Sequence, residues 1–175
     1  MNFHENYNFT IFDQNMKISI IIEQTNIQQI IIHHPKNPLF QKYQNQQIQA
    51  SKKIPDLIEK LIAQIKKTVQ GIQVKKWAIA LDYSKLSPFQ YKVLQFQQKI
   101  PFGLVTSYRL LAEALGKPKA SRAVARALAT NPFPFIIPCH RTVRGDRKLA
   151  GYQGGIEMKK ILLENEGVLI DADPL

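Results

Sequence analysis

Residues 106–130 read TSYRLLAEALGKPKASRAVARALAT, and this stretch decides the architecture of the second half of the chain. Thr106 or Ser107 can cap a first helix, and Gly116 is placed to end it. The spacing of its apolar residues predicts an inward face made of Leu110, Leu111, Ala114 and Leu115.

A second short helix follows the Lys117-Pro118-Lys119 connector. Residues 121–130 are rich in alanine and predict a helix with Arg122 and Arg126 on one face. Its expected inward residues are Val124, Ala127 and Leu128. Two short helices with a tight connector are typical of a helix-turn-helix, although an ordinary helical pair in a core is the alternative. The small side chains favour DNA, because they let a helix backbone approach a groove.

The rest of the chain extends in both directions from this pair. Ser87-Pro88 can start a helix that runs to about Gln98, so we place a domain boundary there, between residues 1–86 and 87–175. In the first part, residues 16–22 and 27–32 predict a β-hairpin, and residues 77–81 predict another strand. Residues 55–69 predict an amphipathic helix that Gly71 ends.

Charge is distributed unevenly along the chain. The sequence has 24 Lys and Arg against 13 Asp and Glu, a net charge of +11. A polyanionic partner and a solvated lysine surface both explain that total. Residues 87–148, however, hold all six arginines and only two acidic residues, Glu113 and Asp146. Arginine binds phosphate and bases through a planar fork of donors, so this segment is the expected contact surface.

Composition also excludes several classes of protein. The single cysteine, Cys139, allows no internal disulfide and no cysteine-based zinc site. The apolar run from Ile18 to Ile22 is too short to span a bilayer, and the N-terminus lacks the pattern of a secretory signal. We therefore expect a soluble, cytoplasmic protein with no membrane partner and no bound metal.

Cys139 lies in an unusual stretch, NPFPFIIPCHR at residues 131–141, whose three prolines stiffen the backbone. A lone buried cysteine is usually a small core residue. Here His140 and Arg141 follow it, and either would favour the reactive thiolate. Because neighbouring residues on an extended strand face opposite ways, the two side chains cooperate only through a turn or a bridging water. A carboxylate would orient the imidazole, and the candidates are Glu157, Glu164 and Glu166.

These residues also carry a family resemblance. Pro138-Cys139-His140-Arg141, Asn131-Pro132 before it and residues 151–155 (GYQGG) after it resemble the O6-alkylguanine-DNA alkyltransferase family, the methylated-DNA–protein-cysteine methyltransferases. The similarity covers residues 87–168 and ends in LLENEG at residues 162–167. It implies an α/β N-terminal domain, with an RNase H-like sheet plus helix, followed by a mainly α winged-helix C-terminal domain.

The resemblance implies a role for each matching residue. Cys139 would be the nucleophile that accepts the alkyl group, His140 and Glu166 a water-bridged relay, Asn131 a hinge, and Tyr108 a donor to the flipped guanine. Residues expected at the DNA are Arg122, which would fill the gap in the stack, with Ser121, Ala123, Arg109, Gln90, Arg126 and Lys117. Residues expected in the base pocket are Tyr152, Gln153, Gly154, Gly155, Lys159 and Pro138.

By the same resemblance, the partner is double-stranded DNA containing O6-alkylguanine, with O4-alkylthymine as a further candidate. The thioether product is stable, so the protein would react once, without cofactor or obligate protein partner. Several positions depart from the family pattern: Thr142 replaces a common valine, Leu94 a common tryptophan, Gln153 a common serine, and Ser87-Pro88 a common Gly-Thr pair.

Two other hypotheses remain open. A binder of alkylated DNA without transfer is similar to the alkyltransferase-like proteins, but these lack the cysteine. A winged-helix regulator in which Cys139 senses electrophiles would prefer one operator sequence, whereas a damage scanner would bind unrelated duplexes with a steep salt dependence.

Overall fold

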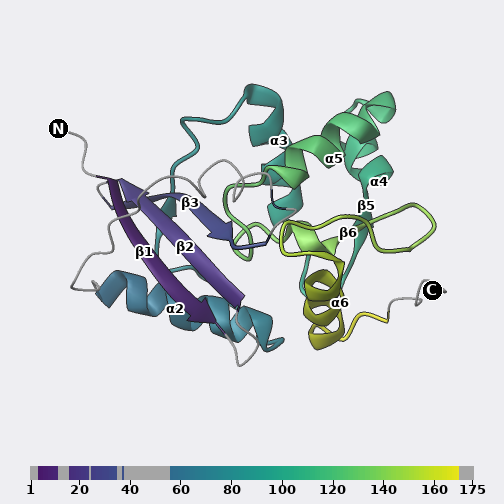
Figure 1. Cartoon of the computed structure of the whole chain (residues 1–175). Coiled ribbons are helices and arrows are strands. Elements are labelled where there is room, and N and C mark those ends of the chain that lie inside the picture. The colour runs from purple at the N-terminus through teal and green to yellow at the C-terminus, as the bar shows by residue number, and fades with distance from the viewer. Residues whose placement is uncertain (1–3, 12–15, 24, 35–36, 38–55, 170–175) are drawn as a thin grey trace.

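The computed structural model describes residues 4–11, 16–23, 25–34, 37 and 56–169 (Figure 1). Its main sheet has the strand order β1-β2-β3-β4. The strands are β1 (His4–Ile11), β2 (Met16–Glu23), β3 (Asn26–Ile32) and β4 (Ala80–Leu81). The first three are antiparallel neighbours, while β4 pairs in parallel with β3. The predicted hairpin is confirmed, with Ile20 opposite Ile30.

The predicted strand at residues 77–81 is shorter than expected. Only Ala80–Leu81 pair with the sheet, because the segment before them is bonded to a helix side chain. Gln64 donates to the Lys76 carbonyl at 2.7 Å and accepts from the Ala78 amide at 2.9 Å. A glutamine side chain thus takes the place of a neighbouring strand.

Helix α2 (Asp56–Val69) lies against the sheet and is followed by Gly71. Its buried residues recur at helical spacing, as predicted, and are Ile58, Leu61, Ile62, Ile65, Thr68 and Val69. Gly71 has a φ of 74°, a conformation that glycine adopts without the penalty of a Cβ. The predicted end of this helix is therefore confirmed.

The second half is mostly helical. Its elements are α3 (Pro88–Gln98), β5 (Thr106–Ser107), α4 (Tyr108–Ala114), η1 (Pro118–Ala120), α5 (Ser121–Ala129), η2 (Cys139–Arg141), β6 (Thr142–Val143) and α6 (Ile156–Asn165). Ser87 caps α3 and Ser107 caps α4, each accepting a backbone N–H with its hydroxyl. β5 and β6 pair in parallel and bring the segment before α4 next to η2.

The predicted inward face of α4 is partly wrong. Leu110 is 51% exposed and Ala114 is also exposed, whereas Leu111 and Ala112 are buried. Because α4 starts at Tyr108, positions 108, 111, 112 and 115 share the face that packs on the core. The inward residues predicted for α5, by contrast, are confirmed as buried.

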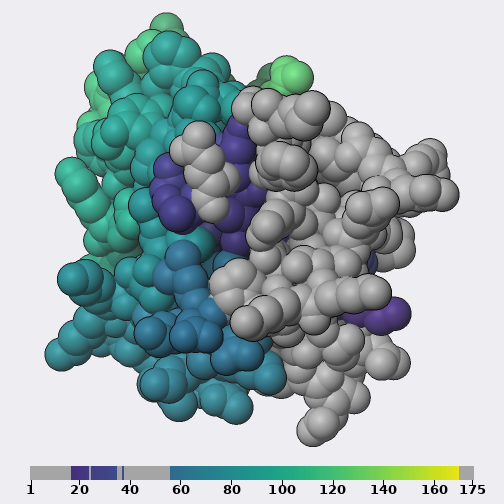
Figure 2. All heavy atoms as spheres, turned by 90° about the vertical axis from the view of Figure 1, so that its left-hand side faces the viewer, coloured from purple at the N-terminus to yellow at the C-terminus, as the bar shows by residue number. Residues whose placement is uncertain are grey.

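The two halves share one hydrophobic core. A single cluster contains isoleucines of β2 and β3, leucines and isoleucines of α2, and residues of α3, α5 and α6 such as Val93, Val124 and Leu162. Figure 2 shows one face on which purple residues of the sheet and blue residues of α2 meet teal residues of the second half. The division into domains at residue 87 stays a prediction. Among the described helices, none has the length and hydropathy of a membrane span.

Candidate active site

Cys139 begins the 3-10 turn η2, so the chain does turn at this point. The Arg141 N–H donates to the Pro138 carbonyl at 3.0 Å, and the Thr142 N–H donates to the Cys139 carbonyl. The cysteine is 6% exposed. Pro138 provides a fixed φ at the start of the turn, which places the thiol at the end of a stiff segment.

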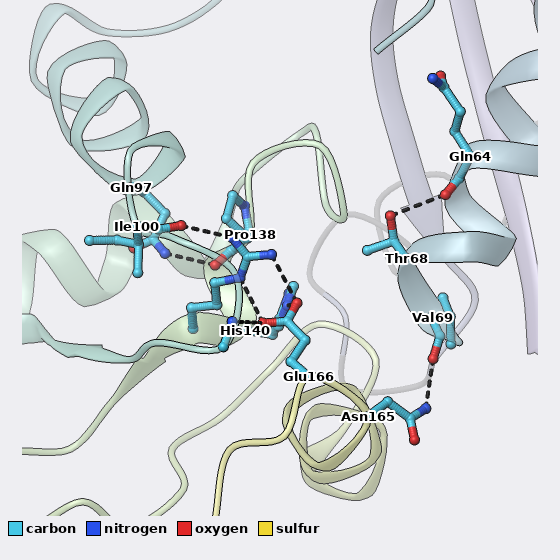
Figure 3. A network of polar contacts seen from close by, with 11 residues as sticks. Gln64, Thr68, Val69, Gln97, Ile100, Pro138, His140, Asn165 and Glu166 are labelled. Atoms are coloured by element: carbon cyan, nitrogen blue, oxygen red, sulfur yellow. Dashed lines mark hydrogen bonds and ion pairs between the residues drawn. The ribbon is translucent and has the colours of Figure 1, made fainter. Parts of the chain in front are cut away.

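A buried ion-pair network lies beside this turn (Figure 3). His140 Nε2 lies 2.9 Å from Glu166 Oε1, and the Arg141 Nε and Nη2 atoms each donate to the Glu166 carboxylate at 2.9 Å. Arg141 Nη1 also donates to the Ile100 carbonyl at 2.7 Å. Of the three candidate acids, the structure brings only Glu166 to His140, since Glu157 and Glu164 are exposed.

The electrostatics of the network determine which ring nitrogen is basic. Burial alone would raise the pKa of Glu166, but hydrogen bonds from His140 and Arg141 outweigh it and bring the pKa to about 2. Burial lowers the pKa of His140, against the opposing effect of Glu166. A carboxylate can only accept, so the proton of the neutral ring sits on Nε2. Nδ1 is then an unprotonated acceptor that is able to take a proton.

The thiol itself needs such a base. Burial raises the pKa of Cys139, while hydrogen bonds from Asn131 and Gln153 and the positive charge of Lys159 act in the opposite direction. The net shift is upward, so the resting thiol stays protonated at neutral pH. The reactive thiolate therefore depends on removal of this proton by a neighbouring group.

Asn131 ties the end of α5 to the segment before Cys139. Its Nδ2 donates to the Ile137 carbonyl at 2.9 Å, and its Oδ1 accepts from the Phe133 N–H at 3.0 Å. Gln153 Nε2 in turn donates to the Asn131 carbonyl at 2.8 Å. All of these residues are buried, so the side chain and carbonyl of Asn131, the predicted hinge, are firmly held.

Lys159 is a fully buried cation next to the same turn. Its Nζ donates to the Thr142 carbonyl at 2.5 Å. Burial lowers its pKa to about 8, with the charge of Cys139 acting in the opposite direction. Tyr108 is half-buried and close enough to Cys139 to feel its charge; burial raises its pKa to about 12, so its hydroxyl remains a donor at neutral pH.

Three buried side-chain atoms have no hydrogen-bond partner within the described part of the chain: His140 Nδ1, the Tyr152 hydroxyl and Gln153 Oε1. Buried polar atoms are nearly always paired, so unpaired ones require an explanation. All three belong to residues of the predicted site. An incoming ligand or water would satisfy them.

The predicted DNA-contacting residues lie mainly on α4, α5 and their connector. Arg109, Lys117, Arg122, Ala123 and Arg126 are exposed, and Ser121 is half-buried. Gln90 has its amide engaged inside the protein: Nε2 donates to the Ala127 and Thr130 carbonyls at 3.3 and 3.1 Å. Its observed contact thus fastens α3 to the end of α5.

Gln97 is a buried residue of this region that the sequence patterns did not predict. Its Nε2 donates to the Pro138 carbonyl at 2.7 Å, and its Oε1 accepts from the Thr142 hydroxyl at 2.5 Å (Figure 3). One amide thus contacts both ends of η2. The available signal was a polar residue on the inward face of α3, one turn after Val93 and Leu94. The pair also gives the hydroxyl of Thr142 its partner.

No metal site is evident in the described residues, which contain no group of three or more His, Cys, Asp or Glu side chains able to hold an ion. A cavity of about 430 Å³ lies between the halves and is lined by Thr68, Trp77, Phe102 and Arg141, among others. Its wall includes Pro138 but not Cys139, so it lies behind the turn.

Comparison with known proteins identifies the second half. The profile of the 6-O-methylguanine DNA methyltransferase DNA-binding domain matches residues 88–168. A methylated-DNA–protein-cysteine methyltransferase from Methanothermobacter thermautotrophicus is 41% identical over 118 residues, which are 67% of this chain and 65% of that protein. The chain is similar to the O6-alkylguanine-DNA alkyltransferase family, most closely over residues 88–168. The predicted resemblance is thereby confirmed.

Other alkyltransferase relatives match the chain over shorter parts. The bifunctional activator and repair enzyme Ada of Escherichia coli is 54% identical over 78 residues, 45% of this chain and 22% of Ada. Like the Methanothermobacter protein, Ada is matched over less than two thirds of its own length.

Solved structures extend the alkyltransferase likeness to the first half. Mycobacterium tuberculosis OGT in complex with DNA has a TM-score of 0.75 and 25% identity, covering 93% of this chain and 92% of that one. The O6-methylguanine-DNA methyltransferase of Pyrococcus kodakaraensis has a TM-score of 0.70 and 27% identity, covering 95% and 100%. The chain therefore shares their mixed arrangement of sheet and helices through nearly its whole length.

Proposed function

We propose that the protein repairs DNA by transferring an alkyl group from O6-alkylguanine to Cys139, once and irreversibly, with O4-alkylthymine as a further candidate substrate. The observation that carries the proposal is the turn at Cys139 beside a histidine whose Nε2 is bound to buried Glu166, leaving Nδ1 without a partner. A thiol of raised pKa and an unpartnered base then lie on adjacent residues.

In the proposed reaction, His140 Nδ1 takes the thiol proton through a water molecule, and Glu166 stabilises the imidazolium. The sulfur attacks the alkyl carbon, a C–S bond forms, and the bond from that carbon to O6 breaks with its electron pair going to guanine. The proton from the thiol ends on the guanine ring. Tyr108, protonated at neutral pH, donates to a ring nitrogen and stabilises the charge that builds there.

Guanine inside a duplex hides its O6, so the nucleotide has to leave the stack, which costs about a few kcal/mol. We infer that α5 enters the DNA groove and that Arg122 fills the vacated gap. The exposed positions of Arg122 and Arg126, and of Lys117 in the connector, support this docking. Arg109, Ser121, Ala123 and Gln90 complete the proposed DNA contact, with Gln90 acting through α5.

The base pocket in this proposal is formed by the loop at residues 152–155, with Pro138 and Lys159. The unpaired Tyr152 hydroxyl and Gln153 Oε1 support a polar ligand at this place. The same scheme takes residues 87–175 as a winged-helix domain and residues 1–86 as an RNase H-like domain. Double-stranded DNA is then the only partner that the reaction requires.

The deciding experiment measures the mass of the protein after incubation with a duplex containing O6-methylguanine. We expect a gain of one methyl group on Cys139 and none in Cys139→Ala. An unchanged mass of the wild-type protein, with retained binding to the alkylated duplex, would instead support a binder without transfer. A strong preference for one undamaged operator would support the regulator.

A further inference from the structure

Three of the contacts that join the described residues of the first half to the site matter here. The Ile30 N–H of β3 donates to the Pro132 carbonyl at 2.7 Å, next to Asn131. The His34 ring lies against Gly155 of the pocket loop. Asn165 Nδ2, at the end of α6, donates to the Val69 carbonyl at the end of α2, also at 2.7 Å (Figure 3).

The ends of α2 and α6 also approach each other closely at Gly71, two residues after Val69. A Cβ placed on Gly71 would lie 2.0 Å from the Asn165 carbonyl oxygen and 2.7 Å from its carbon. These are backbone atoms, which cannot rotate away as the end of a side chain can. Position 71 therefore requires a glycine for two reasons. Its φ of 74° allows α2 to end there, and the absence of a side chain lets the end of α6 come close.

Asn165 immediately precedes Glu166, whose main chain caps α6. The contact with α2 thus fixes the backbone from which the Glu166 carboxylate reaches His140. We propose that Gly71 and Asn165 are positioning residues, which hold the end of α6 where Glu166 can orient His140. This inference rests on the proposed function.

The distances show how sensitive the arrangement is. With a side chain at residue 71, the distance between its Cβ and the Asn165 carbonyl oxygen would have to grow by at least about 1 Å. Only then would it reach a separation found in real structures. The His140–Glu166 bond is 2.9 Å long, and an added 1 Å would take it beyond hydrogen-bond range. The hydrogen bonds from Arg141 would still hold the Glu166 carboxylate near η2. The displacement of α6 would therefore strain the His140–Glu166 hydrogen bond even if the two groups stayed in contact. Misplacement by 1 Å can cost about a hundredfold in rate.

The test compares Gly71→Ala with Gly116→Ala. Both glycines have a left-handed φ, 74° and 69°, so both substitutions introduce similar backbone strain. Gly116, however, has nothing within 4 Å of its added Cβ. We would measure transfer from free O6-benzylguanine, which needs no DNA, and the pH dependence of the reaction of Cys139 with iodoacetamide. Affinity for an undamaged duplex would be measured in parallel.

We expect Gly71→Ala to slow transfer by about tenfold or more and to move the reactivity of the thiol to higher pH, with DNA affinity unchanged. Gly116→Ala should keep the wild-type transfer rate. Asn165→Asp, which keeps the shape of the side chain but removes its donor, should slow transfer by a smaller factor, and it decides the matter if Gly71→Ala does not fold.

Wild-type rates and pH profiles in both Gly71→Ala and Asn165→Asp would overturn the inference, as would equal losses in Gly116→Ala. Failure of the proposed function looks different: the wild-type protein itself would then gain no benzyl group. The iodoacetamide profiles of the variants would still report whether the end of α2 controls the thiol.

Discussion

The turn that holds Cys139 and the helix α5 differ in how their charged groups are satisfied. Around the turn, the ionic side chains of His140, Arg141 and Glu166 are buried or nearly so and bonded to one another. On α5, Arg122 and Arg126 are exposed and form no ion pair within the described part of the chain. Under the proposed function, reactivity would therefore depend on precise internal placement, whereas docking would depend on charge left available to DNA. Substitutions in the two regions should separate these properties.

The largest expected effect belongs to Glu166→Gln. The amide keeps the shape but loses the charge that stabilises a protonated His140, so Cys139 should form its thiolate only at higher pH. We expect transfer to slow by about a hundredfold or more at pH 7, with little change in DNA affinity. Single-turnover kinetics and duplex binding measure the two quantities, and equal transfer rates would remove Glu166 from the mechanism.

Arg122→Ala should affect the exposed surface of α5 rather than the buried turn at Cys139. If this side chain fills the gap left by the extruded base, its loss should slow repair in a duplex by about tenfold or more, while the reaction with free O6-benzylguanine stays unchanged. Arg126→Ala is the matched control on the same helix, and it should weaken binding and lessen its salt dependence. Parallel losses on duplex and free base would contradict the role of Arg122.

The pair Gln97 and Thr142 tests how strongly the buried region is coupled. Either Gln97→Leu or Thr142→Val leaves a buried polar group without its partner, at a cost of about 1–3 kcal/mol in the free energy of unfolding. The double variant removes both groups and should recover much of that loss, since an apolar pair needs no hydrogen bond. Chemical denaturation of the wild type, the two single variants and the double variant gives the coupling free energy between the two side chains. Strictly additive losses would show that the two side chains act independently.

The smallest expected effect is on stability in acid. The pKa of Glu166 is about 2 in the folded protein, below its ordinary value of 4.5, so its ionised form stabilises the fold. That contribution is complete above pH 4.5 and is lost as the pH falls towards 2. The stability difference between wild type and Glu166→Gln should therefore be constant above about pH 5.5 and shrink below 4.5. A difference that stayed constant down to pH 2 would show that Glu166 gains nothing from its partners.

Local patterns in the sequence were enough to predict the hairpin, α2, α3 and α5, because capping residues and apolar spacing act within a few residues. The same patterns failed at residues 77–79, where a distant side chain binds the backbone. Gln64 of α2 bonds to the Lys76 carbonyl and to the Ala78 N–H. The patterns also misplaced the inward face of α4, a helix too short for its period to show clearly.

The residues of the site also separate into those that local sequence predicts and those that it does not. Cys139 and His140 stand out as neighbours in a proline-rich stretch, and Glu166 was one of three candidates that only the folded chain could separate. Gln97 and Asn165 act through partners 41 and 96 residues away, a relation that no local pattern carries. The family resemblance supplied roles for residues, but the contacts to α2 came from the structure.

The bond between Asn165 and Val69 also has a consequence for folding. It closes a loop of 96 residues, and the pair of His140 with Glu166 closes one of 26. Contacts between distant positions form slowly, because the entropy of closing the loop comes before any gain from the contact. Under the proposed function, the thiol would therefore lack its activated base until the loop between His140 and Glu166 has closed.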